Sequence, residues 1–360
     1  MPSDTYAVIM AGGIGSRFWP MSRIARPKQF LDILSSGRTL IQTTFDRMVQ
    51  LTTADRILVV TNEDYIDLVQ EQLPQIRPQH ILAEPIGRNT APCLMFALRM
   101  ISAEQPEAMV IATPADHLVT QSDLFVEDLK LAISQAQLAD WMMTIGIPPT
   151  RPETGYGYIQ YIKESGSPTL PVFEVKTFTE KPDPEMAEAF LKSGDFLWNS
   201  GLLCARSSVL LKAYQKHLTD IYDLFAEISP TNYNPDRVKE IYADCRSISI
   251  DYGLLEHSEE VHTIPARFDW NDLGTWSSVY PFLPKDFLKN ASDGRVVVLN
   301  ARDNLVKAPA DKLTVLLGVD DLIVVDAEDV LLICPRSQEQ KLREIVSMLR
   351  MDRDRYGHYL

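Results

Sequence analysis

The sequence predicts an α/β protein in which a domain built on a mixed, mainly parallel sheet is followed by a smaller β domain. In the first half, short apolar runs alternate with segments of helical spacing, the pattern of repeated strand–helix–strand units. After residue 282, short β-rich runs follow one another with acidic turn residues between them. We therefore expect two domains, residues 1–282 and residues 283–360.

Four apolar runs in the first half are predicted to be strands: residues 6–10, 56–60, 109–113 and 141–147. They are continuously apolar, as expected for parallel strands covered by helices on both faces. Residues 40–48 and 125–136 carry apolar side chains at helical spacing between them. Sheets of this kind bind ligands beyond the carboxyl ends of their strands, so the loops that follow these strands should hold the functional residues.

The pattern changes after residue 155. Aromatic-rich strands are predicted at residues 156–161 and 173–179 and a helix at 184–192, and we interpret residues 155–267 as an insertion that completes the first domain. The second domain has β-rich runs at 296–299, 313–317, 322–325 and 330–333. Residues 338–351 then carry apolar side chains at helical spacing, which predicts a terminal helix.

Composition excludes several classes of function. The 360 residues include 35 basic and 49 acidic side chains, a formal net charge of −14, so nonspecific binding to nucleic acid has no electrostatic basis. An anionic ligand must instead meet a local cluster of cations. The four cysteines lie far apart with no CxxC pair, which argues against a zinc knuckle or a disulfide framework and favours a reducing cytoplasm.

The start of the sequence lacks the features of a signal peptide. Residues 1–11 include Asp4 and no basic residue before the apolar stretch. No apolar run approaches the roughly 20 residues of a membrane span. We therefore expect a cytoplasmic protein that does not bind a membrane.

A glycine-rich turn follows the first predicted strand. Gly12, Gly13 and Gly15 lack side chains, which would let backbone N–H groups approach a phosphate, and the cations Arg17 and Lys28 flank the turn. The turn is not a P-loop, because the chain has no Gly-Lys pair, and it lacks the third glycine of a dinucleotide fingerprint. The combination suits a nucleoside triphosphate in an otherwise acidic protein. The alternative is a tight strand–helix turn with solvated basic residues.

Two aspartates are candidate metal ligands. Asp116 follows the strand predicted at 109–113, and Asp272 lies in the segment FDWNDLGTW. Mg²⁺ usually takes one or two protein carboxylates and fills its other positions with phosphate oxygens and water. Without a metal, two converging carboxylates would repel a phosphate substrate, so electrostatics favour Mg²⁺. The alternative for Asp116 is an ordinary helix N-cap, and we assign no chemical role to the adjacent His117.

Two segments are candidate sugar contacts. Glu180 can accept hydrogen bonds from vicinal sugar hydroxyls, and Asn199 can donate to them. Lys181 can bind a sugar phosphate. The EKP segment is expected to follow a strand and the WNSG segment to precede one. The alternatives are an exposed ion pair of little energetic value for Glu180 and Lys181 and a simple turn for Asn199.

Taken in order, these segments resemble the GDP-mannose-forming members of the sugar-1-phosphate nucleotidyltransferase superfamily, over nearly the whole chain. The resemblance rests on GGIGSRFWPMSR, RPKQF, EPIGRNTAPC, TPADH, FTEKP, WNSG, SIDYGLLE and FDWNDLGTW. It implies a Rossmann-like nucleotidyltransferase domain with a sheet of about seven strands and a short, left-handed β-helix domain. It also implies GTP and α-D-mannose 1-phosphate as substrates, with Mg²⁺.

The resemblance assigns roles residue by residue. It implies that the glycine turn wraps the nucleotide, that Arg17 and Lys28 contact its phosphates, and that Asp116 and Asp272 hold the metal. Further implied nucleotide contacts lie in a base-recognition loop and comprise Glu84, Arg88, Asn89 and Thr90. The implied contacts to mannose phosphate are Glu180, Lys181, Asn199 and Gly201, with Asp251 nearby.

The implied reaction is an in-line displacement without a protein nucleophile. A mannose 1-phosphate oxygen attacks the α-phosphorus of GTP and pyrophosphate leaves, with Arg17, Lys28 and Lys181 positioning and neutralising the phosphates. A carboxylate such as Glu84 can accept from guanine N1–H and N2–H₂ together, a pattern that adenine lacks.

Two other functions remain open at this point. A glucose-1-phosphate nucleotidyltransferase that uses dTTP or UTP shares the glycine turn, the Pro-Lys pair and the two aspartates, although GRNTAP and WNSG favour the mannose enzyme. A noncatalytic sugar-nucleotide sensor could keep the pocket while losing the metal ligands or the phosphate cations, all of which this sequence retains. The sequence does not decide the oligomeric state, although relatives often form homodimers. The chain printed here ends soon after the β domain, so we expect it to lack the isomerase domain of longer, bifunctional relatives.

Overall fold

The structure of the protein, a computed structural model, describes residues 4–13, 15–167, 169–327 and 329–360. Met1 to Ser3, Ile14 of the glycine-rich turn, Pro168 and Glu328 of the C-terminal region therefore lie outside the described residues. Backbone contacts divide the chain into two compact units. The first consists of residues 4–12, Thr44–Ala115 and Val119–Trp270; the second consists of Gly13–Thr43, Asp116–Leu118 and Asn271–Leu360.

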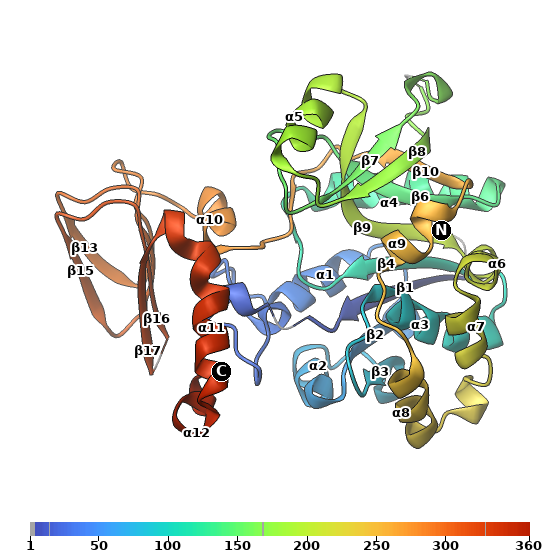
Figure 1. Ribbon diagram of the computed structural model, residues 1–360, viewed down its shortest axis with the longest axis horizontal. Helices are drawn as coiled ribbons and strands as arrows, with labels where there is room; N and C mark the ends of the chain where they lie inside the picture. The colour runs from blue at the N-terminus through green and yellow to red at the C-terminus, as the bar shows by residue number, and fades with distance from the viewer. Residues whose placement is uncertain (1–3, 14, 168, 328) are drawn as a thin grey trace. The chain divides into compact units, whose positions relative to one another are not determined.

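A nine-stranded mixed sheet forms the centre of the first unit, in the order β3-β2-β1-β4-β9-β6-β10-β8-β7 (Figure 1). Strands β1 to β4 pair in parallel, as do β6 and β10, whereas β9 runs antiparallel between β4 and β6. The strands are β1 (Thr5–Ala11), β2 (Ile57–Asn62), β3 (Ile81–Glu84), β4 (Met109–Pro114), β6 (Met142–Ile147), β7 (Gly157–Tyr161), β8 (Phe173–Glu180), β9 (Phe196–Arg206) and β10 (Val261–Pro265).

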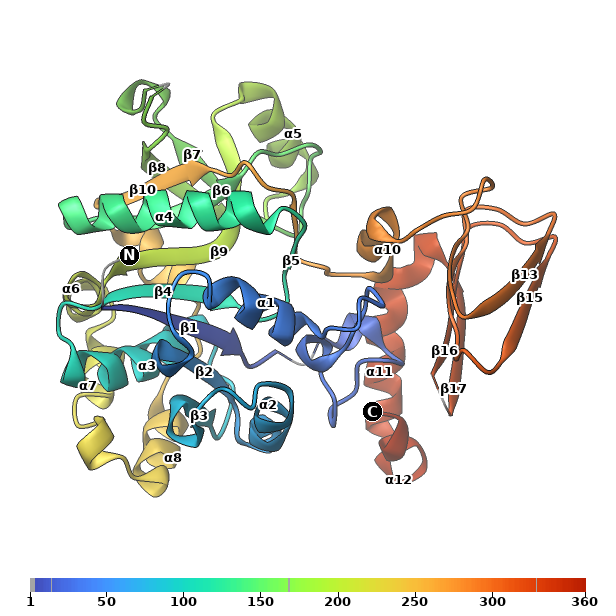
Figure 2. The same ribbon diagram turned by 180° about the vertical axis from the view of Figure 1, so that it is seen from behind.

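Helices pack against this sheet, with α3 on β1 to β3 and α4 on β6 and β9 (Figures 1 and 2). They are α2 (Ile66–Gln72), α3 (Thr90–Glu104), α4 (Ser122–Leu138), α5 (Pro184–Ser193), α6 (Ser207–His217), α7 (Thr219–Leu224), α8 (Pro235–Asp244) and α9 (Ile250–Gly253), and α1 (Leu40–Met48) runs from one unit into the other. Neighbouring side chains of β1 point to opposite faces and are nearly all buried, which explains its continuous apolar run.

The strands and helices predicted in the first domain are all present, with ends shifted by a few residues. The sheet, however, has nine strands rather than about seven. The segment from Trp198 to Gly201 lies inside β9 and does not precede a strand, so this expectation was wrong. Polar Asn199 is opposite Gly146 of β6, beside a register shift between Thr144 and Gly146.

The second unit contains a β-helix. Strands β12 (Ala291–Asp293), β14 (Leu305–Lys307) and β16 (Leu322–Ala327) pair in parallel in one sheet, while β13 (Arg295–Leu299) and β15 (Leu313–Leu317) pair in parallel in another, so the chain alternates between the two. An antiparallel strand, β17 (Val330–Pro335), follows on β16. The helices are α10 (Trp276–Val279), α11 (Leu342–Met351) and α12 (Arg353–Tyr356).

A shared core joins the N-terminal loop of this unit to its β-helix. Phe18 packs edge-to-face on Trp276 with ring centroids 5.0 Å apart, and both are fully buried with Leu305, Ile323 and Val325. Residues 13–43 thus group with the β-helix, although they precede it by about 250 residues of chain. The contact-based division therefore differs from the boundary expected between residues 282 and 283, which stays a prediction.

Two remaining short strands, β5 (Leu118–Val119) and β11 (Trp270–Asn271), pair with each other where the chain changes units. Across the residues that the structure describes, no helix combines the length and the apolar character needed to cross a membrane.

Candidate active site

Lys28 links the two candidate metal ligands in the second unit. Its Nζ donates to the carboxylate Oδ2 of Asp116 at 2.9 Å and to the backbone carbonyl of Asp272 at 2.6 Å. The side chain is buried, with 4% of its surface exposed, and the ammonium lies 5.6 Å from the ring centre of Phe18. A buried ammonium requires a charge partner, and Asp116 supplies it. The structure therefore brings together three residues that are up to 244 positions apart in the sequence.

Gly15 provides the room for this lysine. Its backbone is left-handed, with φ 66°, and a Cβ at this position would lie 2.4 Å from the Cβ of Lys28. Only glycine combines that backbone conformation with so close an approach. The glycine-rich turn thus fixes where Lys28 stands, while Arg17 sits half-buried in the short helical turn Ser16–Phe18 that follows.

Asp116 is held in its charged form. Burial pushes the pKa of this carboxyl upward, but the ammonium of Lys28 and the neighbouring His117 outweigh burial, so the pKa lies below its ordinary value. Asp272 accepts from the backbone N–H of Gly274 at 2.9 Å through one carboxylate oxygen. Lys28 thus meets the carboxylate of Asp116 and the backbone carbonyl of Asp272, and carboxylate oxygens of two such aspartates are ligands that suit a divalent ion.

The described residues contain no group of three or more His, Cys, Asp or Glu side chains that could hold a metal. A metal site with three or more such protein ligands is therefore absent from that part of the chain. A pair of aspartates fits Mg²⁺, because this ion commonly takes one or two carboxylates and completes its shell with substrate phosphates and water.

Glu84 and Gly12 meet in the first unit. Glu84 ends β3 with 3% of its surface exposed, and its Oε1 accepts from the hydroxyl of Tyr242 at 3.0 Å. The other carboxylate oxygen lies 3.1 Å from the position that a Cβ on Gly12 would occupy. Burial raises the pKa of Glu84 to about 7, partly offset by the bond from Tyr242. Near neutral pH this carboxyl can therefore gain or lose a proton.

Three further residues predicted to contact the nucleotide also build the loop that carries them. The Arg88 guanidinium donates to the backbone carbonyls of Tyr242 at 2.8 Å and Ala243 at 3.0 Å. Asn89, with φ 70°, caps α3 through its side chain, which accepts from the N–H of Thr90 at 2.8 Å. These contacts fix the loop between β3 and α3.

Thr90 extends the same network to a distant segment. Its hydroxyl accepts from the N–H of Ile250 at 2.9 Å, which ties the start of α3 to the start of α9. Helix α9 carries Asp251, which is an implied sugar contact. The loop between β3 and α3, which carries implied nucleotide contacts, is therefore bonded to the segment that carries Asp251.

Asn199 and Asp251 form the centre of a second group in the first unit. The Asn199 amide donates to Asp251 Oδ1 at 2.6 Å, and Asn199 Oδ1 accepts from the N–H of Gly201 at 3.1 Å. Gly201 has φ 71°, a left-handed conformation that turns the backbone N–H toward this amide. Burial raises the pKa of Asp251, and the bond from Asn199 opposes that rise.

Glu180 joins this group while Lys181 stays outside it. A narrow cavity is lined by Glu180, Asn199 and Asp251 together with Tyr252 and Glu256. Lys181, with φ 48°, is exposed and pairs with Glu180. Carboxylates and an amide around one small cavity offer acceptors and a donor for vicinal hydroxyls.

Sequence reasoning missed two residues that shape these groups. A Cβ at Gly157 would lie 2.5 Å from Glu180 Oε2, so this glycine makes room for the carboxylate. Tyr242 holds Glu84 from a point 158 residues away, and no local pattern signals such a contact. Gly157 follows the aromatic Tyr156, and a glycine inside a predicted strand was the available signal for a close approach.

Comparison with known proteins identifies what the chain resembles. The Nucleotidyl transferase family matches residues 6–286, and the family described as MannoseP isomerase/GMP-like beta-helix domain matches residues 294–349. The alginate biosynthesis protein AlgA of Pseudomonas fluorescens is 37% identical over 348 residues, which cover 95% of this chain and 71% of that protein. The mannose-1-phosphate guanylyltransferase of Escherichia coli K12 is 35% identical over 360 residues, covering 97% and 74%.

A solved structure is also similar over nearly the whole chain. The crystal structure described as mannose-1-phosphate geranyltransferase from Thermus thermophilus has a TM-score of 0.87 and 30% sequence identity. The match covers 96% of this chain and 99% of that one. The nucleotidyl transferase region and the β-helix region therefore occur together in that structure as they do here.

Proposed function

Because the chain belongs to the nucleotidyl transferase family, we propose that it transfers GMP from GTP to α-D-mannose 1-phosphate, giving GDP-mannose and pyrophosphate. The observation that carries this proposal is the convergence of Lys28, Asp116 and Asp272, which is suited to bringing phosphates together. The choice of substrates is supported by the relative named mannose-1-phosphate guanylyltransferase, at 35% identity over most of the chain.

The proposed step is a single displacement in which atoms and charges balance. An oxygen of the sugar phosphate forms a bond to the α-phosphorus of GTP, and the bond from that phosphorus to the bridging oxygen of the β-phosphate breaks. A phosphate monoester is largely ionised at neutral pH, so the nucleophile needs no general base. Positioning and charge neutralisation must then provide the catalysis.

Enzymes of this kind generally use a divalent metal, and we propose Mg²⁺ held by Asp116 and Asp272. When bound, the ion supplies positive charge to phosphate oxygens. The chain's own residues would position the two aspartates. Lys28 pairs with the carboxylate of Asp116, and the backbone N–H of Gly274 donates to the carboxylate of Asp272.

Arg17 and Lys28 are the proposed cations for the leaving pyrophosphate. Lys28 would exchange its contact with Asp116 for a phosphate oxygen when substrate binds. In the sugar group, exposed Lys181 would orient the attacking phosphate, while Glu180 and the Asn199–Asp251 pair would bind mannose hydroxyls. Gly201 would hold Asn199 in the conformation that this requires.

The proposed nucleotide contacts are the glycine turn and Glu84. Gly12, Gly13 and Gly15 would leave the backbone N–H groups open to the nucleotide, and the ionised form of Glu84 would accept from guanine. Arg88, Asn89 and Thr90 are further proposed nucleotide contacts, and their bonds within the chain would hold the loop in place for that purpose.

Release of pyrophosphate tests the proposal. The purified protein is mixed with Mg²⁺ and each pairing of GTP, ATP, dTTP or UTP with mannose 1-phosphate or glucose 1-phosphate. We expect the fastest release from GTP with mannose 1-phosphate. Faster release from dTTP or UTP with glucose 1-phosphate would identify the glucose enzyme, and binding of GDP-mannose without any release would identify a sensor.

Asp116→Asn and Asp272→Asn test the metal ligands. Each variant is expected to lose about two orders of magnitude or more in turnover, because an amide binds a divalent ion far less well than a carboxylate. Asp311→Asn, at an exposed position of the second unit, is the matched control. Wild-type turnover of both variants at saturating Mg²⁺ would remove these residues from the mechanism.

We also propose a cytoplasmic location and a homodimer. The described cysteines are all free, which is compatible with a reducing compartment. Five aliphatic side chains on β13 and β15 are each more than half exposed and point to one face: Val297, Leu299, Leu313, Val315 and Leu317. A second copy of the chain would cover such a face, and sedimentation should give twice the chain mass of 40.7 kDa.

A further inference from the structure

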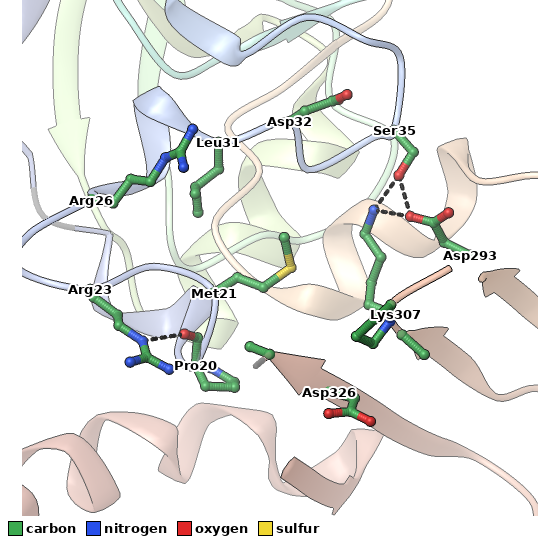
Figure 3. A pocket seen from close by; sticks show the side chains of 13 residues that line it. Pro20, Met21, Arg23, Arg26, Leu31, Asp32, Ser35, Asp293, Lys307 and Asp326 are labelled. Atoms are coloured by element: carbon green, nitrogen blue, oxygen red, sulfur yellow. Dashed lines mark hydrogen bonds and ion pairs between the residues drawn. The ribbon is translucent and has the colours of Figure 1, made fainter. Parts of the chain in front are cut away.

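A second cavity lies wholly within the second unit and contains none of the residues assigned above. Its volume is about 590 Å³, within the range of small-molecule sites. The N-terminal loop forms one wall, and the β-helix forms the other (Figure 3). The side chains that matter are Met21, Arg23, Arg26, Leu31, Asp293 and Lys307.

The carboxylates around this cavity are already satisfied. Asp32 accepts from two backbone N–H groups of the turn that follows it, at 2.6 and 2.9 Å. Asp293 pairs with Lys307 at 2.7 Å, and Asp326 pairs with Lys312 at 2.6 Å. Each negative charge therefore has a partner supplied by the chain, and none needs a cation from solution.

The three cationic side chains that line the cavity differ in how many of their N–H donors are bonded within the chain. Arg23 pairs with Asp329, whereas the guanidinium of Arg26 has no hydrogen bond or ion pair to any residue that the structure describes. Lys307 is nearly fully buried and donates to Ser35 and Asp293. An ammonium has three donors, so within the described chain one N–H of Lys307 is left over.

The loop holds Arg26 in place by its backbone. The N–H and carbonyl groups of Arg23 and Arg26 bond to each other in both directions at 3.1 Å, which closes a small turn. Figure 3 shows Arg26 and Lys307 on opposite sides of the cavity with Met21 between them. Apolar Leu31 lines the same wall as Arg26. Two donors thus flank an apolar floor.

We propose that this cavity binds a small organic anion with an apolar body. Its carboxylate or phosphate group would pair with the planar fork of Arg26, which matches either group with two parallel N–H donors. Its apolar part would cover Met21 and Leu31, and the remaining donor of Lys307 would receive a polar acceptor at the far end. The satisfied carboxylates leave Arg26 as the charge that selects an anion over a neutral molecule.

A ligand in this cavity would lie next to the loop that carries Lys28. Arg26 precedes Pro27 and Lys28, so a ligand on the guanidinium would touch the segment that carries the proposed catalytic lysine. The binding proposal itself does not depend on the proposed function, because it can be measured without turnover.

Methionine methyl signals can test the site in the full chain. The protein is labelled with ¹³C at the methionine methyl groups, and the Met21 signal is assigned with Met21→Leu. The probe is 2-naphthoate, an anion with an apolar body, and its neutral counterpart is 2-naphthalenemethanol. Met351, which is 87% exposed, reports nonspecific binding.

We expect 2-naphthoate to shift the Met21 signal saturably while the Met351 signal stays in place. The alcohol should bind up to about fivefold more weakly, since the loss of one solvent-exposed charge pair is worth at most roughly that factor. Arg26→Gln should weaken naphthoate binding by about the same factor, and Arg343→Gln, on exposed α11, should not.

Three results would overturn the proposal. They are an unmoved Met21 signal at the solubility limit of naphthoate, equal affinities for the acid and the alcohol, and unchanged affinity in Arg26→Gln. The acid–alcohol comparison uses the unmodified chain, so it decides the matter even if the Arg26 variant folds poorly.

Discussion

The backbone at Gly15 has φ 66°, and a Cβ there would lie 2.4 Å from the Cβ of Lys28. Gly37 has φ 80°, yet a Cβ on it would meet nothing within 4 Å. The two glycines therefore share the conformational constraint, and only Gly15 adds a steric one. This pair separates the cost of backbone conformation from the cost of displacing the lysine.

We expect Gly37→Ala to lose about 1–2 kcal/mol of unfolding free energy and to keep its turnover, because only the left-handed backbone is penalised. Gly15→Ala should lose more stability and about a hundredfold in turnover, since a displaced Lys28 mispositions the phosphates. Urea unfolding and pyrophosphate release measure the two quantities. Equal turnover in both variants would show that the position of Lys28 does not matter.

Glu84 should make stability depend on pH. Burial raises its pKa from 4.5 to about 7, so between these values the folded protein holds a proton that the unfolded chain has released. The resulting stabilisation is complete below pH 4.5 and is lost as the pH rises toward 7. Glu84→Gln removes this dependence, because an amide stays neutral throughout.

Unfolding free energies at pH 5, 6, 7 and 8 test this expectation. As the pH rises toward 7, the unfolding free energy of Glu84→Gln should increase relative to that of the wild type by up to about 1.4 kcal/mol per pH unit. Above pH 7 the difference between the two proteins should become constant. Glu71→Gln, on an exposed part of α2, controls for the loss of one carboxyl. A constant difference between Glu84→Gln and the wild type across this range would contradict the raised pKa.

Among the elements, the β-helix coils are joined by a pair of buried asparagines. The Asn304 amide donates to Asn290 Oδ1 and to the carbonyl of Val319, both at 2.9 Å, and its own Oδ1 accepts from the N–H of Leu322 at 2.9 Å. Asn290 donates in turn to the carbonyl of Ala301 at 3.0 Å. These bonds connect successive coils at the same corner.

Asn304→Leu should therefore destabilise the second unit by about 2–4 kcal/mol, because it leaves several buried backbone and amide groups without partners. Thermal unfolding followed by calorimetry measures the loss. Asn300→Gly, at a position with φ 51°, is the matched control, since glycine accepts that conformation and the residue is exposed. If both variants unfold at the same temperature, the asparagine pair is not what holds the coils.

Elements with a clear apolar period could be predicted from the sequence, and others could not. The α4 and α11 helices have one apolar face and were predicted. Helix α3 was not, because residues 91–98 are buried all round and leave no period to detect. The start of strand β9 was placed too late for a different reason: its apolar run contains polar Asn199 and Ser200, which resemble a turn before a strand.

Contacts within the candidate site were predictable only in part. The sequence motifs identified Lys28, Asp116 and Asp272, which the structure gathers, but not that Lys28 pairs with Asp116. The roles of Arg88 and Asn89 in building the loop depend on carbonyl groups of α8 and on a positive φ, and neither leaves a local sequence signal.

At the scale of the whole molecule, the core of the second unit combines residues from both sides of the expected boundary at 282. Phe18 and Trp276 precede it, whereas Leu305, Ile323 and Val325 follow it. A chain of residues 1–282 would therefore leave Phe18 and Trp276 more exposed. That chain would lack Leu305, Ile323 and Val325, which share a core with Phe18, whose ring centre lies 5.6 Å from the ammonium of Lys28.

We expect residues 1–282 to retain the circular dichroism of the nine-stranded unit and to lose at least about a hundredfold in pyrophosphate release, because the cluster around Lys28 loses its support. Tryptophan fluorescence should shift to the red as Trp276 becomes exposed. Turnover close to that of the full chain would show that the β-helix is dispensable for the chemistry.

The second unit is assembled from three separate stretches of chain, two of which interrupt the first unit. A gene fragment that encodes only the C-terminal stretch would carry the β-helix but not the N-terminal loop that completes its core. Recombination at a single breakpoint therefore cannot transplant this unit intact into another protein. Its ancestry should follow that of the nucleotide-binding sheet, with both parts inherited or lost as one.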